Sequence, residues 1–395
     1  MRILMLDNEF PPLGGGMGTV NAALFKRYAS LPDLEIDLIT AALGGQREQV
    51  RFAPQITIYK VPVWNQNIHH STNRELMLYS AQALPLALRL HRHRPYDLCL
   101  AWSAVPAGGV ALALRQATGL PYAVWVSGPD IPGFEQRYAR LYPVLRPAID
   151  QIWRGSAAVV AKCQEEIEMI HAVNPRVEVQ LIPNGVDLEL FQPGPPIPDD
   201  GPLVVICAAR LIERKGQHHL IEAARLLADQ GLDVRIRLVG TGDSLPDYQA
   251  LAERLGVIGR VEFVGYVPRE QIPQHYAAAH AFALPSFNEG LSLSALEAAA
   301  CGLPLVLTRT GGTDDLVEEG VNGLTFDWAD VPALAAHLAR LATDRALARQ
   351  MGAASHLRAQ RFGWPAIAQQ FLDLFDATAG PQAARPLPPQ PRRSV

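Results

Sequence analysis

Cysteine is scarce in this 395-residue chain, and the four cysteines that occur are widely separated. They are Cys99, Cys163, Cys207 and Cys301, and no two of them form a C-x-x-C pair. Zinc sites and redox dithiols are usually built on such pairs, so neither is expected. Cysteine usage of this kind fits a reducing compartment, where disulfides do not persist.

The chain also lacks a long apolar run. The apolar stretch in Met1–Asp7 is too short for a signal peptide and predicts a first strand instead. A long uncharged run, Leu98–Leu114, is interrupted by Pro106 and by Gly108-Gly109, whereas a membrane span needs about 20 apolar residues. We therefore expect a cytoplasmic protein that touches a membrane at most from its inner face.

A strong excess of positive charge is missing as well. The formal net charge is −4, which argues against a nucleic-acid partner held by general electrostatics. Apolar residues make up 49% of the chain and charged residues 19%, which is typical of globular proteins. The length is sufficient for two domains with sizeable cores.

Short apolar runs alternate with helical patterns along the chain. The predicted strands are 3–6, 35–39, 57–61, 98–102, 123–126, 157–160 and 180–182, followed by 203–208, 235–239, 261–264, 281–284 and 305–307. Alternation of this kind predicts parallel sheets with helices on both faces. The expected fold class is α/β, with two doubly wound, Rossmann-like domains that face each other across a ligand-binding cleft.

A run of prolines and turn-forming residues, 191–202, predicts a linker. It separates an N-terminal domain at 1–190 from a C-terminal domain at 203–362. An amphipathic helix is expected at 363–379. The tail at 380–395 is rich in Pro and Arg, has no core-forming pattern and is expected to be disordered.

The segment Pro285–Pro304 follows a buried strand and combines a polar turn with a helix. The turn carries Glu289, and the helix carries Glu297. A helix N-terminus offers unpaired N–H groups and a positive dipole end, which suit phosphate and sugar hydroxyls. Carboxylates repel phosphate, so we expect them to face a sugar. Glu297 has a second interpretation, because Ser294-x-x-Glu297 fits a capping box that needs no ligand.

Two cations follow the first strand of the second domain. Arg210 and Lys215 are expected at the carboxyl end of strand 203–208, the edge where doubly wound sheets bind ligands. A guanidinium and an ammonium group five residues apart suit a diphosphate. The alternative is a solvated basic loop, since Glu213 and Arg214 lie between them.

A glycine-rich loop, Gly14–Gly16, follows the first strand and opens a helix. Its N–H groups suit a phosphate, although a plain glycine turn is also compatible with the pattern. Position 19 is Thr, so G-x-G-x-x-G is not matched, and no acid stands at Thr40 to hold a ribose. A dinucleotide site of the NAD type is therefore disfavoured.

Together these residues resemble the retaining glycosyltransferases of the GT-B fold, in the large family 4, also called group 1. The matching motifs are the loop at Gly14–Gly16, Pro183-Asn-Gly-Val-Asp187, Arg210 with Lys215-Gly216, Gly240-Thr-Gly242, Gly265-Tyr-Val267, and an E-x7-E element at Glu289 and Glu297. The resemblance implies that a nucleotide-diphosphate sugar binds mainly to the second domain and the acceptor mainly to the first. It also implies that helix 363–379 crosses back onto the first domain.

The resemblance implies a role for each matching residue. Arg210 and Lys215 neutralise the diphosphate leaving group, and Glu289 contacts the donor sugar. Glu297 holds the ribose hydroxyls. The remaining donor-binding residues implied in this way are Gly15, Gly16, Gly240, Gly242, Val267, Gly290, Leu291 and Ser292.

One position departs from the family pattern. The family often has His-Gly after the strand that ends here at Val126, whereas this chain has Ser127-Gly128. A serine hydroxyl is no general base at neutral pH without help, so a mechanism that needs an imidazole there is disfavoured. Retaining enzymes of this fold are thought to use the leaving phosphate oxygen as the base while the protein stabilises the diphosphate. Ser127 and Asp130 are expected on the acceptor side, and Asp130 is otherwise a turn residue.

No D-x-D motif occurs in the chain, so no metal is expected at the diphosphate, and Arg210 and Lys215 would take its place. No cofactor is expected beyond the nucleotide-sugar co-substrate. The basic cluster Arg89–Arg94 complements the dipole of a helix end. The alternative is contact with anionic lipid headgroups, which is relevant for a lipid-linked acceptor.

The leading hypothesis is a retaining, metal-independent hexosyltransferase of polysaccharide or glycolipid biosynthesis. It would move a sugar from a UDP- or GDP-linked donor to a hydroxyl of a glycan, a lipid or a small molecule. A GT-B-type nucleotide-sugar epimerase is an alternative, although Glu289 alone is in reach for removing a proton from the sugar ring. A non-catalytic sugar-nucleotide-binding protein is another, motivated by Ser127 and opposed by the intact set Arg210, Lys215, Glu289 and Glu297.

Overall fold

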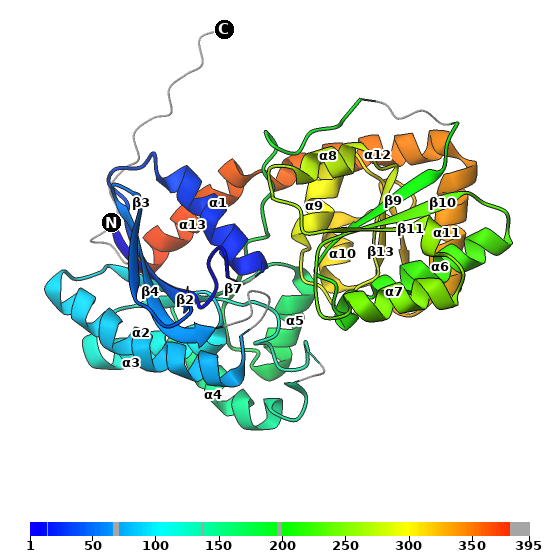
Figure 1. Cartoon of the computed structure of the whole chain (residues 1–395). Coiled ribbons are helices and arrows are strands. Elements are labelled where there is room, and N and C mark those ends of the chain that lie inside the picture. The colour runs from blue at the N-terminus through cyan, green and yellow to red at the C-terminus, as the bar shows by residue number, and fades with distance from the viewer. Residues whose placement is uncertain (14, 66–70, 136–137, 196–199, 380–395) are drawn as a thin grey trace, which may run out of the picture. The chain divides into compact units, whose positions relative to one another are not determined.

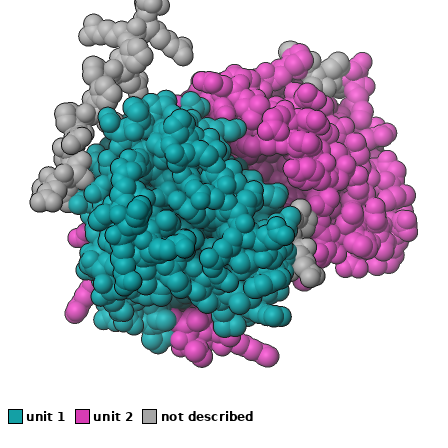
Figure 2. All heavy atoms as spheres, turned by 60° about the vertical axis from the view of Figure 1, so that its left-hand side comes forward, with its two compact units in different colours: residues 1–125, 147–159, 368–395 teal, residues 126–146, 160–367 magenta. Residues whose placement is uncertain are grey.

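A computed structural model describes residues 1–13, 15–65, 71–135, 138–195 and 200–379. Over these ranges the chain is an alternating α/β protein that divides into two compact units (Figures 1 and 2). Unit 1 holds residues 1–125, 147–159 and the segment from 368 onward, and unit 2 holds residues 126–146 and 160–367. The domain boundaries at 190, 202 and 362 stay predictions, and the tail at 380–395 lies outside the described residues.

The first sheet has the strand order β3-β4-β2-β1-β5-β6-β7-β8. Its strands are β1 (Arg2–Leu6), β2 (Glu35–Leu43), β3 (Glu48–Ala53), β4 (Ile56–Asn65), β5 (Leu98–Ala101), β6 (Tyr122–Trp125), β7 (Ala158–Ala161) and β8 (Val179–Leu181). The pairs β1–β2, β1–β5, β2–β4 and β5–β6 are parallel, as predicted, whereas β3 runs antiparallel to β4. β3 was not predicted, because this edge strand is polar, half of its residues are exposed, and it has no apolar run.

Helices cover both faces of the first sheet. In Figure 1, α1 (Gly16–Tyr28) and α13 (Trp364–Ala379) lie on one side of the strands, and α2 (Asn73–His93) and α3 (Gly109–Thr118) lie on the other. The Tyr28 hydroxyl donates to the Ala368 carbonyl at 3.0 Å, and the rings of Tyr28 and Phe375 are 6.3 Å apart. These contacts pack the α13 segment that belongs to unit 1 against α1. Two further helices are α4 (Tyr142–Gly155) and α5 (Gln164–Val173).

The second sheet has the order β11-β10-β9-β12-β13-β14, and all five neighbouring pairs are parallel. Its strands are β9 (Leu203–Ala208), β10 (Val234–Val239), β11 (Val261–Gly265), β12 (Ala281–Leu284), β13 (Leu305–Thr308) and β14 (Gly323–Phe326). β14 was not predicted, because it has only four residues, of which one is glycine and one is threonine. The strand order reverses between β9 and β12, and doubly wound sheets bind ligands at such a point.

Helices also cover both faces of the second sheet. Figure 1 shows α6 (Gln217–Asp229) and α7 (Leu245–Arg254) on one face and α9 (Leu293–Ala300) and α12 (Arg345–Ala359) on the other. The remaining helices are α8 (Ile272–Ala277), α10 (Gly311–Leu316) and α11 (Val331–Thr343). Phe191, which the sequence analysis assigned to the linker, is fully buried in the core of this unit. No described helix has the length and the apolar character needed to cross a membrane.

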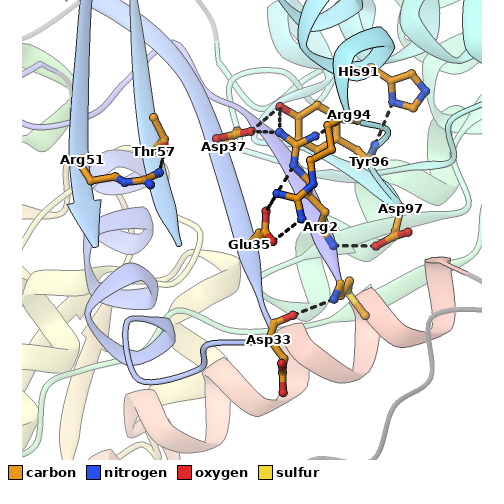
Figure 3. Close-up of polar contacts among 11 residues, drawn as sticks. Arg2, Asp33, Glu35, Asp37, Arg51, Thr57, His91, Arg94, Tyr96 and Asp97 are labelled. Carbon is orange, nitrogen blue, oxygen red and sulfur yellow. Dashed lines mark hydrogen bonds and ion pairs between the residues drawn. The ribbon is translucent and has the colours of Figure 1, made fainter. Parts of the chain in front are cut away.

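A charged network anchors the amino end of β1 in unit 1 (Figure 3). The Arg2 Nη2 atom lies 2.6 Å from Asp37 Oδ2, and the Tyr96 hydroxyl donates to the same carboxylate oxygen at 2.6 Å. The Arg2 guanidinium also lies over the Tyr96 ring, 4.0 Å from its centroid. The backbone N–H of Arg2 donates to Asp97 at 2.7 Å. The network therefore ties β1 to β2 and to the segment before β5.

Replacing Arg2 by Met should lower the free energy of unfolding by about 2–3 kcal/mol, because Asp37 would stay buried without its cation. Urea denaturation at pH 7 measures this loss. The control is Arg225→Met, which breaks the exposed pair with Asp229 on α6 and should change stability by less than about 0.5 kcal/mol. Equal losses in both variants would show that the burial of the Arg2 pair is energetically irrelevant.

Candidate functional site

The candidate site lies in unit 2, where five loops leave the carboxyl edge of the second sheet. Parallel strands place all their carboxyl ends at one edge, so the loops after β9, β10, β11, β12 and β13 are neighbours. Most of the predicted donor-binding residues lie on these loops or at the start of α9.

An ion pair joins the loops on either side of the point where the strand order reverses. Lys215 ends a short 3-10 turn after β9, and Glu289 lies in the loop after β12. The Lys215 Nζ atom pairs with Glu289 Oε1, and the two side chains are 13% and 17% exposed. The structure therefore brings two of the three predicted catalytic residues into direct contact.

The third predicted catalytic residue, Arg210, belongs to the same electrostatic cluster. Burial lowers the pKa of Lys215, the Glu289 carboxylate opposes this effect, and the charges of Arg214 and Arg210 add to it. Burial raises the pKa of Glu289, but Lys215 and Arg214 more than offset the effect, so this pKa lies below the usual glutamate value. Lys215 and Arg214 therefore act on one ionised carboxylate and Arg210 acts on Lys215, an excess of positive charge that attracts a further anion.

Backbone contacts lock the Lys215 turn to the loop after β12. The Phe287 N–H donates to the Arg214 carbonyl at 2.8 Å. Gly216 has a φ of +68°, and a Cβ atom there would lie only 1.9 Å from the Pro285 carbonyl oxygen. Glycine is therefore required at this position, both for its positive φ and for the close approach of the two backbone segments.

The loop after β12 leads directly into the N-terminus of α9. Gly290 is half-buried and Leu291 is buried, and Ser292 is the N-cap, whose hydroxyl accepts from the Ala295 N–H at 3.4 Å. The predicted capping box at Ser294 and Glu297 is therefore wrong. Ser292 has an extended conformation and α9 begins at Leu293, which places Glu297 inside the helix rather than in its first turn.

Glu297 has a different set of partners from Glu289. Its Oε1 atom lies 2.7 Å from Arg269 Nη1, and the Tyr276 hydroxyl donates to Oε2 at 3.4 Å. The residue is 7% exposed, and burial raises the pKa of its carboxyl group against the opposing effect of Arg269. The two acids of the E-x7-E element thus face different loops, and sequence reasoning identified neither Arg269 nor Tyr276.

The predicted residues of the β10 and β11 loops lie close to the Arg210 loop. The Gly240 N–H donates to the Gly265 carbonyl at 2.8 Å, and the Leu211 N–H donates to the Thr241 carbonyl at 2.9 Å. Cβ atoms on Gly240 and Gly242 would lie 2.2 Å from the carbonyl oxygens of Ala209 and Leu211. Val267, in the loop after β11, is half-buried against the core.

Ser127 and Asp130 form a tight turn in unit 2. The Ser127 backbone N–H and hydroxyl both donate to Asp130 Oδ1, each at 2.7 Å. This geometry favours the turn interpretation of Asp130 over a direct role in orienting an acceptor. Val126, directly before the turn, accepts a hydrogen bond from Lys162 Nζ at 2.8 Å.

Gly15 and Gly16 lie in unit 1, at the N-terminus of α1. The Gly15 N–H donates to the Glu9 carboxylate at 2.9 Å. The Gly15 N–H group, which the resemblance assigns to the donor diphosphate, is therefore already hydrogen-bonded to a carboxylate. Gly14 lies outside the described residues.

The segment 310–312 and a group of side chains in this region were not predicted. Thr310 lies in the loop after β13, and Gly311 and Gly312 begin α10. Thr310 and Gly312, together with Glu289 and Ser292, line a small hollow. Residues of α5 and its flanking loops also contact the site. The sequence feature that could have predicted their involvement is Lys162, a charged residue directly after the buried strand β7. Among the described residues, no group of three His, Cys, Asp or Glu side chains could hold a metal ion.

Comparisons with known proteins match almost the whole chain. The model of the glycosyl transferase 4-like domain matches residues 15–185, and that of the glycosyl transferases group 1 matches residues 192–358. The chain is 33% identical to a GDP-mannose-dependent alpha-(1-6)-phosphatidylinositol monomannoside mannosyltransferase of Mycolicibacterium smegmatis, over 92% of this chain and 95% of that protein. It is 32% identical to a D-inositol 3-phosphate glycosyltransferase of Kribbella flavida, over 97% of each.

The chain belongs to the group 1 glycosyltransferases. Its fold is also similar to that of sucrose-phosphate synthase from Thermosynechococcus elongatus, with a TM-score of 0.84, 24% identity and coverage of 95% of this chain and 98% of that one. The predicted α/β fold of GT-B type and the prediction of a transferase enzyme are confirmed. The role of each site residue in this glycosyltransferase stays a prediction.

Replacing Glu289 by Gln should destabilise the protein by about 1–2 kcal/mol at pH 7 and progressively less at acid pH. The folded-state pKa of Glu289 lies below its unfolded value of about 4.3. The stabilisation from the ionised pair is therefore complete above that value and is lost as the pH falls through the folded-state pKa. Urea denaturation at pH 7, 5 and 3.5 compares the two proteins.

The control for this experiment is Glu262→Gln, which removes an exposed partner of Arg237 and should have little effect at any pH. A stability difference between Glu289→Gln and the parent that is constant from pH 7 to 3.5 would contradict the prediction.

Proposed function

We propose that this glycosyltransferase transfers a sugar from a nucleotide-diphosphate sugar to an acceptor hydroxyl, with retention of the anomeric configuration and without a metal ion. The observation that carries the proposal is the ion pair of Lys215 with Glu289, directly before the N-terminus of α9. It places a cation for a phosphate and a carboxylate for a sugar hydroxyl side by side.

The diphosphate is the first part of the donor to consider. Lys215 supplies a point charge and Arg210 a planar fork of donors, and Arg214 adds to the positive potential. The N–H groups at the start of α9 and the dipole of that helix favour an anion in the same place. As the bond from the sugar C1 atom to the phosphate oxygen breaks, these groups stabilise the charge that develops on the diphosphate. The cations perform this task with protein groups alone.

The sugar and the ribose are assigned to the two acids. A diphosphate that attracts Lys215 frees the Glu289 carboxylate to accept hydrogen bonds from sugar hydroxyls. Glu297, held by Arg269 and Tyr276, is assigned to the ribose hydroxyls. This division of roles is supported by their different partners, since Glu289 pairs with Lys215 and Glu297 pairs with Arg269.

Retention of the anomeric configuration is supported by the lack of a free general base at the acceptor-side residues Ser127 and Asp130. Asp130 Oδ1 already accepts two hydrogen bonds from Ser127, and no imidazole occupies position 127. We therefore assign the role of base to the departing phosphate oxygen. It takes the acceptor proton while the acceptor oxygen bonds to C1 on the face that the phosphate leaves, so the configuration at C1 is retained.

The donor and the acceptor are proposed from the two curated relatives. The name of one specifies GDP-mannose as donor, and both names include an inositol-bearing compound. We propose a GDP- or UDP-linked hexose as donor, with GDP-mannose to be tested first. The proposed acceptors are inositol-bearing lipids or phosphates, within the wider class of glycan and lipid acceptors.

A donor screen tests the proposed function directly. The matching nucleotide sugar at 100 times its Kd should stabilise the protein by about 2.7 kcal/mol in thermal unfolding. The product made with that donor should show by NMR the anomeric configuration of the donor, and the rate should be the same with and without EDTA. Inversion at C1, or a rate abolished by the chelator, would contradict the proposed mechanism.

Replacing Lys215 by Ala should reduce kcat by about 10²–10³-fold, because one group that stabilises the leaving diphosphate is removed. Steady-state rates with saturating donor measure the effect. Arg225→Ala, on the exposed surface of α6 in the same unit, is the control and should retain the parent rate. Unchanged turnover in Lys215→Ala would count against a role in leaving-group stabilisation.

A further inference from the structure

A buried ion pair at the start of α5 lies outside the residues assigned above. Lys162 is 5% exposed and Glu166 is fully buried, and the Lys162 Nζ atom lies 2.5 Å from Glu166 Oε1. The backbone N–H of Lys162 donates to Glu166 Oε2 at 2.8 Å, and Nζ also donates to the Val126 carbonyl at 2.8 Å. The pair is therefore tied to the backbone at two points.

This pair packs directly against the donor loop, defined here as Glu289–Leu291. A Cβ atom on Gly290 would lie 2.7 Å from Glu166 Oε1 and 2.8 Å from Lys162 Cε. Gly312 approaches the loop closely as well, since a Cβ atom there would lie 1.9 Å from the Gly290 carbonyl oxygen. Neither contact leaves room for a side chain, so Gly290 is enclosed by the ion pair and by the first turn of α10.

Neighbouring residues hold the same region by hydrogen bonds. Glu165 Oε2 accepts from the Gly311 N–H at 2.7 Å, and the buried Asn184 donates from Nδ2 to the Leu291 carbonyl at 2.6 Å. The N-terminus of α5 thus contacts the donor loop through Glu166 and the N-terminus of α10 through Glu165.

Burying two charges carries a large desolvation penalty, and apolar residues of similar volume often stabilise a fold equally well. Stability alone is therefore a weak reason for a charged pair at this position. A pair with fixed backbone partners has one defined geometry, and the donor loop packs directly against it. Small displacements of a binding group can reduce a rate by about 10²-fold.

We propose that Lys162 and Glu166 are positioning residues, which hold the donor loop so that its peptide groups and the Glu289 carboxylate meet the nucleotide-diphosphate sugar. This inference rests on the proposed function of that loop. It assigns the pair no contact with the substrate and no part in proton transfer.

The test compares full-length Lys162→Met, Glu166→Gln and Glu166→Leu with the parent protein. Lys162→Met should raise the donor KM or lower kcat/KM for the donor by about 10–100-fold. Glu166→Gln keeps an acceptor for the Lys162 N–H and should have a smaller effect than Glu166→Leu. Recovery by the amide but not by the apolar residue distinguishes hydrogen-bonded positioning from simple filling of space.

The matched control is Arg2→Met, which breaks another largely buried ion pair, in unit 1, where the donor loop is absent. It should lower the melting temperature while the donor KM stays at the parent value. All rates are measured at least 10 °C below the lowest melting temperature, with folding checked by circular dichroism. Should Lys162→Met fail to fold, the two Glu166 variants carry the comparison.

Two results would overturn the proposal: a donor kcat/KM at the parent value in the folded Lys162→Met and Glu166→Leu proteins, or an equal change in donor KM in Arg2→Met. The transferase activity of the parent protein distinguishes failure of this proposal from failure of the proposed function. If the parent transfers no sugar, the proposed function fails. Thermal-shift titration with GDP and UDP then still compares nucleotide affinity between the parent and the variants.

Discussion

The ion pair between Lys215 and Glu289 is the interaction around which the site is arranged. It exists because β9 and β12 are adjacent parallel strands, so the loops that follow them meet at one edge of the sheet. The hydrogen bond from Phe287 to the Arg214 carbonyl and the close approach of Gly216 to Pro285 keep these loops in register. A cation and a carboxylate are thereby presented together at the N-terminus of α9.

The surroundings of this pair are closely packed and largely buried. Gly290 is enclosed by the Lys162–Glu166 pair and by Gly312, and Asn184 holds the next carbonyl group. Dipoles and charges that are fixed before a ligand arrives need not reorganise when charge develops on it, and the proposed stabilisation of a leaving diphosphate depends on this property. The close contacts explain why the loop contains glycine where a larger residue would displace the backbone.

Local patterns were sufficient to predict much of this protein. Buried strands followed by polar loops placed Arg210, Lys215 and Glu289 at the carboxyl edge of a parallel sheet, and that edge is observed. The prediction failed where a local pattern had two interpretations, as at Ser294 and Glu297, where Ser292 caps the helix instead. It also failed for β3 and β14, because a polar edge strand and a four-residue strand lack the apolar periodicity from which strands are predicted.

The sequence by itself determined the fold class, the family and the residue types available for binding a diphosphate sugar, because these depend on periodicity and on motifs of short range. Only the tertiary structure decided which residues meet. Lys215 and Glu289 are 74 positions apart, and the order of the strands likewise brings Glu297 to Arg269. Gly290 and Lys162 follow strands of two different sheets and meet through the packing of α5 against the donor loop. Strand order follows from packing of the whole sheet and its helices, which no local pattern encodes.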